Sequence, residues 1–438
     1  MKRIEPGKVR ETIAARMLAD GFDIVLDLEK SGGGYIHDSS TGRDFLDLFS
    51  FFASAPLGMN HPRLLEPDFL EHLARVAVNK PSNSDFYTSE MATFVDCFAS
   101  TLIPDSYPYL FFISGGALAV ENALKAAFDW KVRKNIAAGR GEIGSRVIHF
   151  RNAFHGRTGY TLSLTNTADP RKYMYFPRFD WPRIDCPAAR FPIRDHLETT
   201  EAAEKAALGQ IDEAIARHGH DIACIVIEPI QGEGGDNHFR PEFLRELRRR
   251  ADESELMLIY DEIQTGMGLT GPWWAWQALE VPPDIFCFGK KTQVCGIACS
   301  SRIDEVPENV FHVSSRLNST WGGNLVDMVR CTRYLEIMQE EDTLQNVSAR
   351  SEQLMRGLHG LAASFDAIGN VRGRGLMCAF DLPSAEARDR TLKAAFSEGA
   401  ILLPCGCSSI RFRPPLNISG REIDRALEIL RAALSKTS

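Results

Sequence analysis

The chain has 438 residues, of which 44 % are hydrophobic and 25 % are charged, so it is long enough for two or three domains around a large buried core. Its net charge of −8 leaves no basic surface for nucleic acid or an anionic membrane. The ten cysteines form no CxxC pair and no regular framework, which argues against a zinc site or a disulfide scaffold. With no apolar signal segment at the N-terminus, we expect a cytoplasmic protein with reduced thiols, no metal and no membrane span.

The opening residues predict a short helix followed by a β-hairpin. The hairpin is expected in "GGYIHDSSTGRDFLDLFS" (residues 33–50), with its turn at Asp38 to Gly42. We expect residues 1–60 to pack with the C-terminal part of the chain, because residues 61–324 are expected to form a domain that is complete without them.

Residues 61–324 predict a large α/β domain. Apolar runs of strand length alternate with helical stretches, and this alternation indicates βαβ units and a mostly parallel sheet buried on both faces. The strand runs are YLFFIS (109–114), RVIHF (146–150), ACIVIEP (223–229), LMLIYDE (256–262) and IFCFGKK (285–291), and the helices between them include Ala117–Lys131, Thr200–Arg217 and Pro241–Ser254.

Residues 325–438 predict a smaller α+β domain. A long helical region that begins at Leu325 is followed by three short strand segments, RGLMCAFDLP, AILLPCG and SIRFRPPL. A helix in REIDRALEILRAALS closes the chain.

The carboxyl ends of parallel strands are where open α/β sheets bind their ligands. This rule selects Ser114, Phe154, Glu228, Asp261 and Lys290, each at or just beyond the end of a predicted strand.

Three of these strand ends suggest a common chemistry. The small residues after Ser114 lead into a helix whose N-terminus could bind a phosphate or could simply be capped. Asp261 follows five apolar residues and needs a cationic partner, unless it caps a loop. Lys290 ends another apolar run, where a lysine emerging into solvent would be the ordinary reading. A helix N-terminus for a phosphate, a carboxylate for a pyridinium nitrogen and an amine for an aldehyde together fit pyridoxal 5′-phosphate.

With these features in this order, the chain resembles the class III (ornithine/GABA-type) aminotransferases of PLP fold type I over nearly its whole length. The resemblance rests on SGGALAVENALKAAFDWK, FHGRTGYTLSLTN, IVIEPIQGEGGDNHFRP, IYDEIQTGMGLTGPWWAW, FGKKTQVCG, LNSTWGGN and IRFRPPL. It implies a fold with a large, mostly parallel sheet covered by helices on both faces, a smaller α+β domain, and a homodimer with shared active sites.

The resemblance also assigns the residues around the cofactor ring. Lys290 matches the lysine that bonds the cofactor aldehyde, with Lys291 as the weaker candidate. Asp261 matches the carboxylate that keeps the pyridine nitrogen protonated. Gln264 matches the residue that hydrogen-bonds the ring oxygen.

Further cofactor contacts follow from the same resemblance. Ile263 and Phe154 match the residues that enclose the ring from its two faces. Gly116 and Ala117 match positions whose backbone N–H groups hold the phosphate. Thr320 matches a residue that reaches the phosphate of the neighbouring subunit.

Four positions match substrate-binding residues of the family. Arg157 matches the arginine that holds the carboxylate remote from the reacting carbon. Arg411 matches the arginine for the α-carboxylate of glutamate or 2-oxoglutarate, with Arg413 as its structural competitor. Glu233 matches the glutamate that neutralises Arg411, and Phe52 matches a residue lining the substrate pocket.

Two departures from the broad family pattern bear on the substrate. The chain has Leu269-Thr270-Gly271 where most members have Arg-Thr-Gly, and GKKTQVCG where most have Gly-Lys followed by small residues. Both resemble members that act on L-lysine. The resemblance therefore implies transfer of the ε-amino group of L-lysine to 2-oxoglutarate, which yields 2-aminoadipate 6-semialdehyde and L-glutamate. The alternatives are another ω-amine (ornithine, acetylornithine or GABA), or a non-catalytic phosphate-binding α/β protein.

Overall fold

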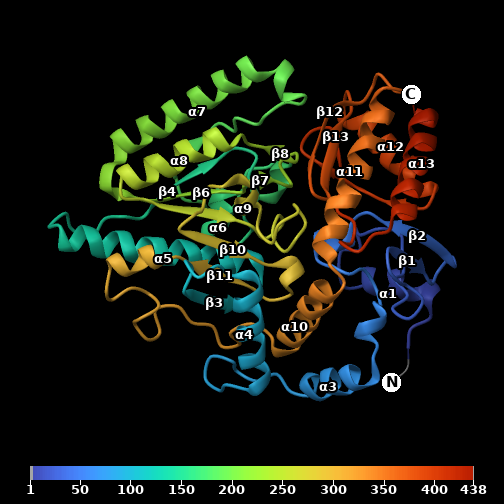
Figure 1. Cartoon of the computed structure of the whole chain (residues 1–438), viewed down its shortest axis with the longest axis horizontal. Coiled ribbons are helices and arrows are strands. Elements are labelled where there is room, and N and C mark those ends of the chain that lie inside the picture. Colours follow the sequence, from blue (N-terminus) through green and yellow to red (C-terminus); the bar gives the residue numbers. More distant parts are fainter. Residues whose placement is uncertain (1–2, 438) are drawn as a thin grey trace.

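The computed structural model describes residues 3–437. Figure 1 shows two bodies side by side, a large sheet covered by helices and a smaller body built from the C-terminal residues. The N-terminal hairpin lies with the smaller body, although the whole central block separates the two in the sequence.

The larger body contains a seven-stranded sheet. In spatial order its strands are β3 (Tyr109–Ile113), β11 (Cys295–Cys299), β10 (Ile285–Phe288), β9 (Met257–Asp261), β6 (Ile222–Ile227), β4 (Arg146–Phe150) and β5 (Arg183–Ile184). The strands from β10 to β5 are parallel, and β11 runs antiparallel to both of its neighbours. The prediction of a large, mostly parallel sheet is confirmed.

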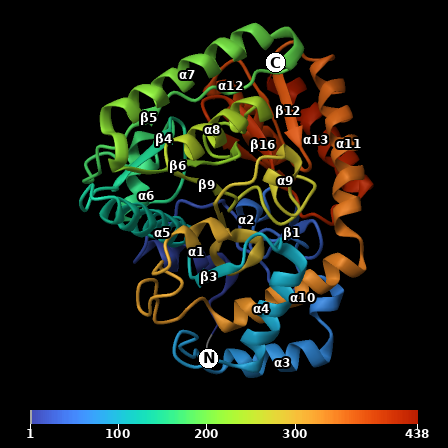
Figure 2. The same ribbon diagram turned by 60° about the vertical axis from the view of Figure 1, so that its left-hand side comes forward.

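Helices cover both faces of this sheet, as expected for strands that are apolar throughout. Along β9, Met257 and Ile259 pack toward α5, whereas Leu258 and Tyr260 point to the opposite core. The covering helices are α5 (Gly116–Ala137) on one face and α4 (Ser89–Leu102), α7 (Leu197–His218) and α8 (Pro241–Glu253) on the other. Figure 2 shows α7 and α8 above the sheet and α5 below it.

The smaller body has a four-stranded antiparallel sheet covered by helices. Its strands are β12 (Gly369–Arg374), β13 (Met377–Asp381), β16 (Ser409–Phe412) and β15 (Leu403–Cys405), and its helices are α11 (Thr343–Ala362), α12 (Ala385–Ser397) and α13 (Gly420–Thr437). The predicted long helical region is two helices, because Asp342, at φ 48°, breaks it after α10 (Leu325–Glu340).

The N-terminal hairpin adds to a separate three-stranded sheet. Strands β1 (Tyr35–Asp38) and β2 (Arg43–Asp47) pair as predicted, and β2 also pairs with the C-terminal strand β14 (Ala400–Ile401). Helix α10, by contrast, packs on α4 and α3 of the central block. The division into residues 1–60, 61–324 and 325–438 stays a prediction.

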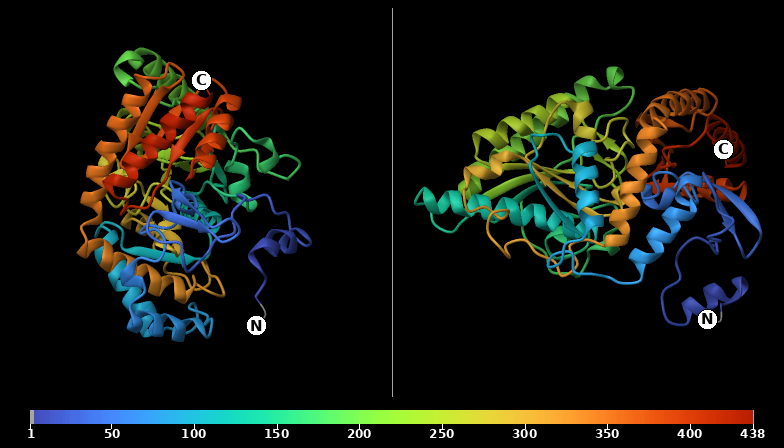
Figure 3. Two further views of the ribbon diagram at one scale, coloured as in Figure 1. Left: turned by 90° about the vertical axis from the view of Figure 1, so that its right-hand side faces the viewer. Right: turned by 60° about the horizontal axis from the view of Figure 1, so that its bottom comes forward.

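The remaining elements are short. They are α1 (Val9–Ala14), α2 (Ser50–Ala53), α3 (Pro67–Ala77), α6 (Gly159–Leu164), α9 (Ala275–Leu279), β7 (Ile230–Gln231) and β8 (Asn237–His238). Figure 3 shows α1 standing away from the rest of the chain. In the described part of the chain, no helix combines the length and apolar character that a bilayer crossing needs.

The turn α2 is left-handed, which is unusual for residues with side chains. All four residues of Ser50–Ala53 have positive φ, at 39°, 53°, 61° and 65°, a conformation that disfavours each by about 1–2 kcal/mol. Asp47 Oδ1 accepts hydrogen bonds from the backbone N–H groups of Phe49 (2.9 Å) and Ser50 (2.7 Å), and Ser50 Oγ donates to the carbonyl of Arg413 at 2.6 Å. These buried bonds hold the strained turn against β16.

Asp47 makes the stability of this turn dependent on pH. Burial raises the pKa of Asp47 from 3.8 to about 6, despite its two backbone hydrogen bonds. The folded state therefore binds a proton at Asp47 more tightly than the unfolded state does. The stabilisation from that proton is lost as pH rises from about 4 to 6, and the free energy of unfolding falls by up to about 3 kcal/mol.

We expect Asp47→Asn to remove this part of the pH dependence, because the amide oxygen can accept the same hydrogen bonds and cannot ionise. Urea unfolding of parent and variant at pH 4.5 and pH 7 would measure it. The variant should gain stability relative to the parent at the higher pH. If the free energies of unfolding of parent and variant differed by the same amount at pH 4.5 and pH 7, the role of Asp47 would be contradicted.

Candidate active site

A cavity of about 290 Å³ opens at the carboxyl edge of the large sheet. Four of the five residues selected at strand ends line this cavity. The fifth, Ser114, is exposed, and Gly116 and Ala117 at the start of the following helix line the cavity instead. The lining residues are Gly116, Ala117, Phe154, His155, Gly156, Glu228, Glu233, Asp261, Ile263, Gln264, Lys290 and Cys295. This volume lies near the lower end of the range for small-molecule sites.

Asp261 and Lys290 reach this cavity from the ends of two adjacent parallel strands. Asp261 ends β9 and lies opposite Cys287 of β10. Strand β10 stops at Phe288, and Lys290 then turns out of the sheet with φ 54° at the start of a 3₁₀ turn (Lys290–Thr292). This left-handed residue, rather than the strand itself, directs the lysine into the cavity.

The two consecutive lysines have different environments. Lys291 is fully buried, and its Nζ donates to the backbone carbonyls of Gln264 (2.9 Å) and Ala53 (3.3 Å). Within residues 3–437, the amine of Lys290 has no hydrogen-bond partner of this kind. Burial lowers the pKa of Lys290, and Arg411 lowers it further, whereas Asp261 opposes the shift. Lys290 therefore offers an available amine, and Lys291 fixes the backbone around it.

Asp261 is oriented by a buried histidine. His155 Nδ1 lies 2.8 Å from Asp261 Oδ2, and the backbone N–H of Ile263 donates to Oδ1 at 3.1 Å. Burial lowers the pKa of His155, but the hydrogen bond and charge of Asp261 outweigh that effect and raise it overall. The two hydrogen bonds hold the Asp261 carboxylate in one orientation.

Gln264 is held by the more deeply buried of the two candidate arginines. Arg413 donates from Nε to Gln264 Oε1 at 2.9 Å, which leaves the amide nitrogen of Gln264 free to donate elsewhere. The same guanidinium makes two bonds to Asp236, at 2.9 and 2.5 Å, between side chains that are 1 % and 0 % exposed. Arg413 is therefore committed to structure, which favours Arg411 as the substrate arginine.

The loop after β4 packs directly on the start of α5. Gly156 has φ 124°, and a Cβ there would lie 2.4 Å from the Cβ of Ala117, so only glycine permits this approach. Phe154 is fixed on this loop because its backbone N–H donates to Glu228 Oε1 at 2.9 Å. Burial raises the pKa of Glu228 to about 7. Gly116 and Ala117, in the first turn of α5, line the same cavity as Phe154, and the N–H groups of a first helical turn have no partner within the helix and suit an anion.

Glu233 lies between two cations. Its Oε2 accepts from Nη2 of the buried Arg411 at 2.7 Å, and its Oε1 accepts from Lys172 Nζ at 2.5 Å. Burial raises the pKa of Glu233, but the charges and hydrogen bonds of Arg411 and Lys172 outweigh burial and lower it overall. Arg411 Nε is buried and has no hydrogen-bond partner among the described residues.

Four predicted site residues do not line the cavity. One of them, Arg411, is bound to the lining residue Glu233. Arg157 is exposed, with its guanidinium carbon 6.0 Å from the ring centroid of Phe154. Phe52 is 49 % exposed on the left-handed turn, and Thr320 is exposed on a loop. Their roles stay predictions.

Sequence reasoning missed several residues that shape this site. Asp236 directly follows the GEGG segment, and His155 directly follows Phe154, so both stood beside predicted site residues. Gly156 and Lys172 gave no local signal, because the first depends on contact with α5 and the second is one charged residue in an irregular, mostly polar segment.

The buried Arg413–Asp236 pair should dominate local stability. We expect Asp236→Ala to lower the free energy of unfolding by about 3–5 kcal/mol, because it leaves an uncompensated buried guanidinium. The exposed Arg425–Glu428 pair is a matched control, since both side chains are more than half exposed. Glu428→Ala should change stability by no more than about 1 kcal/mol. Similar losses in the two variants, measured by urea unfolding, would contradict this account.

Comparison with known proteins places these features in a family context. The sequence pattern described as "Aminotransferase class-III" matches residues 18–434. An L-lysine-epsilon aminotransferase of Mycobacterium tuberculosis (strain ATCC 25618 / H37Rv) is 54 % identical over 432 residues, covering 98 % of this chain and 96 % of that protein. The L-lysine-epsilon aminotransferase of Amycolatopsis lactamdurans is 51 % identical over 430 residues, covering 98 % and 95 %. A solved structure of lysine aminotransferase from M. tuberculosis matches with a TM-score of 0.97 and 52 % identity, covering 99 % of this chain and all of that one.

Proposed function

The chain belongs to the class III aminotransferases, and from this premise we propose that it moves the ε-amino group of L-lysine to 2-oxoglutarate. The products are 2-aminoadipate 6-semialdehyde and L-glutamate. The lysine specificity is supported by relatives of nearly equal length that are named for it and share about half of their residues with this chain.

Class III aminotransferases depend on pyridoxal 5′-phosphate, and the residues of the cavity fit this group. When bound, the cofactor carries the amino group between substrates and supplies an electron sink for the carbanion at the reacting carbon. Lys290 would meet its aldehyde, Asp261 its ring nitrogen, and the first turn of α5 its phosphate. The observation that carries the proposal is the convergence of Lys290 and Asp261 on one cavity, with the amide nitrogen of Gln264 left free as a donor.

The chain's own groups account for the proton transfers. A lowered pKa keeps a larger fraction of the Lys290 amine neutral, so the amine can take a proton from the ε-carbon of lysine as a general base and later act as a general acid. Asp261, oriented by His155, presents its carboxylate to the cavity.

Replacing Lys290 tests this assignment directly. We expect Lys290→Ala to lose the covalent cofactor bond, read as added mass after borohydride reduction, and at least about a hundredfold in turnover. Lys291→Met is the matched control and should keep the added mass, since Lys291 binds backbone carbonyls only. A fully active Lys290→Ala enzyme would refute the role.

The Glu233–Arg411 pair suggests how one site serves two different substrates. Lysine presents an uncharged carbon beside Arg411, whereas 2-oxoglutarate and glutamate present a carboxylate there. A buried arginine without a partner is costly, so we propose that Glu233 neutralises Arg411 while lysine is bound and moves aside for the dicarboxylate.

Glu233→Ala should therefore harm one half-reaction more than the other. We expect the lysine half-reaction to slow by at least about tenfold more than the glutamate half-reaction, because only lysine leaves Arg411 unpaired. Single-turnover absorbance measurements with each substrate separate the two. Equal losses in both would count against the switch.

Product identification from L-lysine plus 2-oxoglutarate tests the function as a whole. A panel with ornithine, acetylornithine and GABA in place of lysine decides among the related ω-amine donors. A homodimer with shared sites is part of the proposal, supported by the exposed position of Thr320 outside the cavity of its own chain. A cytoplasmic location stays a prediction.

A further inference from the structure

Glu233 has a second cationic partner that the exchange between substrates must take into account. Its two carboxylate oxygens are divided, with Oε2 bound by Arg411 from β16 and Oε1 bound by Lys172 from an irregular segment of the larger body. Arg411 is 3 % exposed and Lys172 is 16 % exposed, so both cations approach from largely buried positions. The carboxylate therefore bridges a buried cation and one nearer the surface.

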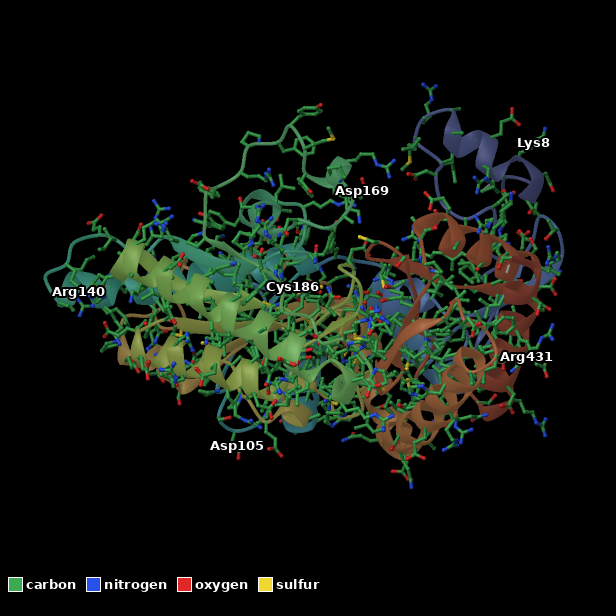
Figure 4. All side chains as sticks on the ribbon, turned by 90° about the horizontal axis from the view of Figure 1, so that it is seen from above. Lys8, Asp105, Arg140, Asp169, Cys186 and Arg431 are labelled. Atoms are coloured by element: carbon green, nitrogen blue, oxygen red, sulfur yellow. The ribbon has the colours of Figure 1, made fainter. Side chains whose placement is uncertain are left out.

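The position of Lys172 is set by local structure. Lys172 ends a short 3₁₀ turn (Pro170–Lys172) that Asp169 caps by accepting from the backbone N–H of Arg171 at 3.1 Å. The backbone N–H of Met174 then closes the turn on the carbonyl of Pro170 at 2.8 Å. Figure 4 labels Asp169 on the segment that projects from the larger body. The turn thus presents Lys172 as part of an ordered loop.

Lys172 also lies over the aromatic wall of the cavity. Its Nζ is 5.8 Å from the ring centroid of Phe154, a lining residue. Among residues 3–437, Glu233 is the only acidic side chain within ion-pair distance of Lys172. The ammonium is therefore positioned for Glu233 and for the edge of the substrate site.

The two partners contribute differently when Glu233 moves. A dicarboxylate that binds Arg411 must displace the Glu233 carboxylate from it. The displaced carboxylate is partly buried and still needs a positively charged partner. Lys172 already holds the other oxygen, so the carboxylate can leave Arg411 without becoming unpaired. Loss of Lys172 would therefore destabilise the state in which the dicarboxylate occupies Arg411 more than the state in which Glu233 is still paired with Arg411.

We propose that Lys172 is a positioning residue that retains Glu233 after it leaves Arg411 and so favours binding of the dicarboxylate substrate. This inference rests on the proposed exchange between lysine and 2-oxoglutarate. Lys172 itself takes no part in proton transfer.

The test compares the two half-reactions in the holoenzyme of the Lys172→Met variant. Methionine keeps an unbranched side chain of similar length and removes the positive charge. We expect the dissociation constants for glutamate and 2-oxoglutarate to rise about tenfold, with the maximal rate of that half-reaction nearly unchanged. The lysine half-reaction should stay within about twofold, and Lys172→Arg should restore dicarboxylate binding. A loss confined to the lysine half-reaction would overturn the proposal.

A double-mutant cycle separates action through Glu233 from direct contact with substrate. In a Glu233→Gln background, Lys172→Met should have no further effect on dicarboxylate affinity. A persistent loss there would show that Lys172 binds the substrate carboxylate itself, which also overturns the proposal. A parent enzyme that accepts glutamate but not lysine would refute the proposed donor while leaving this measurement valid.

Discussion

The site depends on the neutralisation of two buried arginines of the smaller body, Arg411 on β16 and Arg413 directly after it. Arg413 is paired with Asp236 out of contact with water, and Arg411 is paired with Glu233, which is 26 % exposed. Both carboxylates belong to one loop of the larger body. Charge compensation thus joins the two bodies, and the difference in burial leaves one pair permanent and the other able to open.

The same loop is held by close backbone contacts. The N–H of Gly406 donates to the carbonyl of Glu233 at 3.0 Å, and a Cβ at Gly406 would lie 2.8 Å from the Cα of Gly235. With the backbone fixed, movement of Glu233 is confined to its side chain. A side-chain rotation that takes Glu233 off Arg411 while Lys172 keeps hold of it is a smaller change than a loop movement, and it leaves Asp236 in place.

Backbone strain also occurs around the reactive lysine. Lys290 and Gln293 have positive φ, and so does every residue of the turn Ser50–Ala53. The two strained segments are tied together, since Lys291 Nζ donates to the carbonyl of Ala53 and Gln293 Nε2 donates to that of Ser54 at 2.8 Å. Strained residues persist only where surrounding contacts fix them, and here those contacts hold the reactive lysine in one direction.

The sequence by itself determined five strands of the large sheet, its mostly parallel character and the residues at the carboxyl ends of those strands, because apolar periodicity and strand-to-helix alternation are local properties. It therefore predicted Asp261 and Lys290, while it missed β11, in which Gly296 weakens the strand pattern. Only the tertiary structure decided between Arg411 and Arg413 and revealed Lys172. These assignments depend on which charges meet across the fold, and a charged side chain shows its partner only after distant segments have packed together.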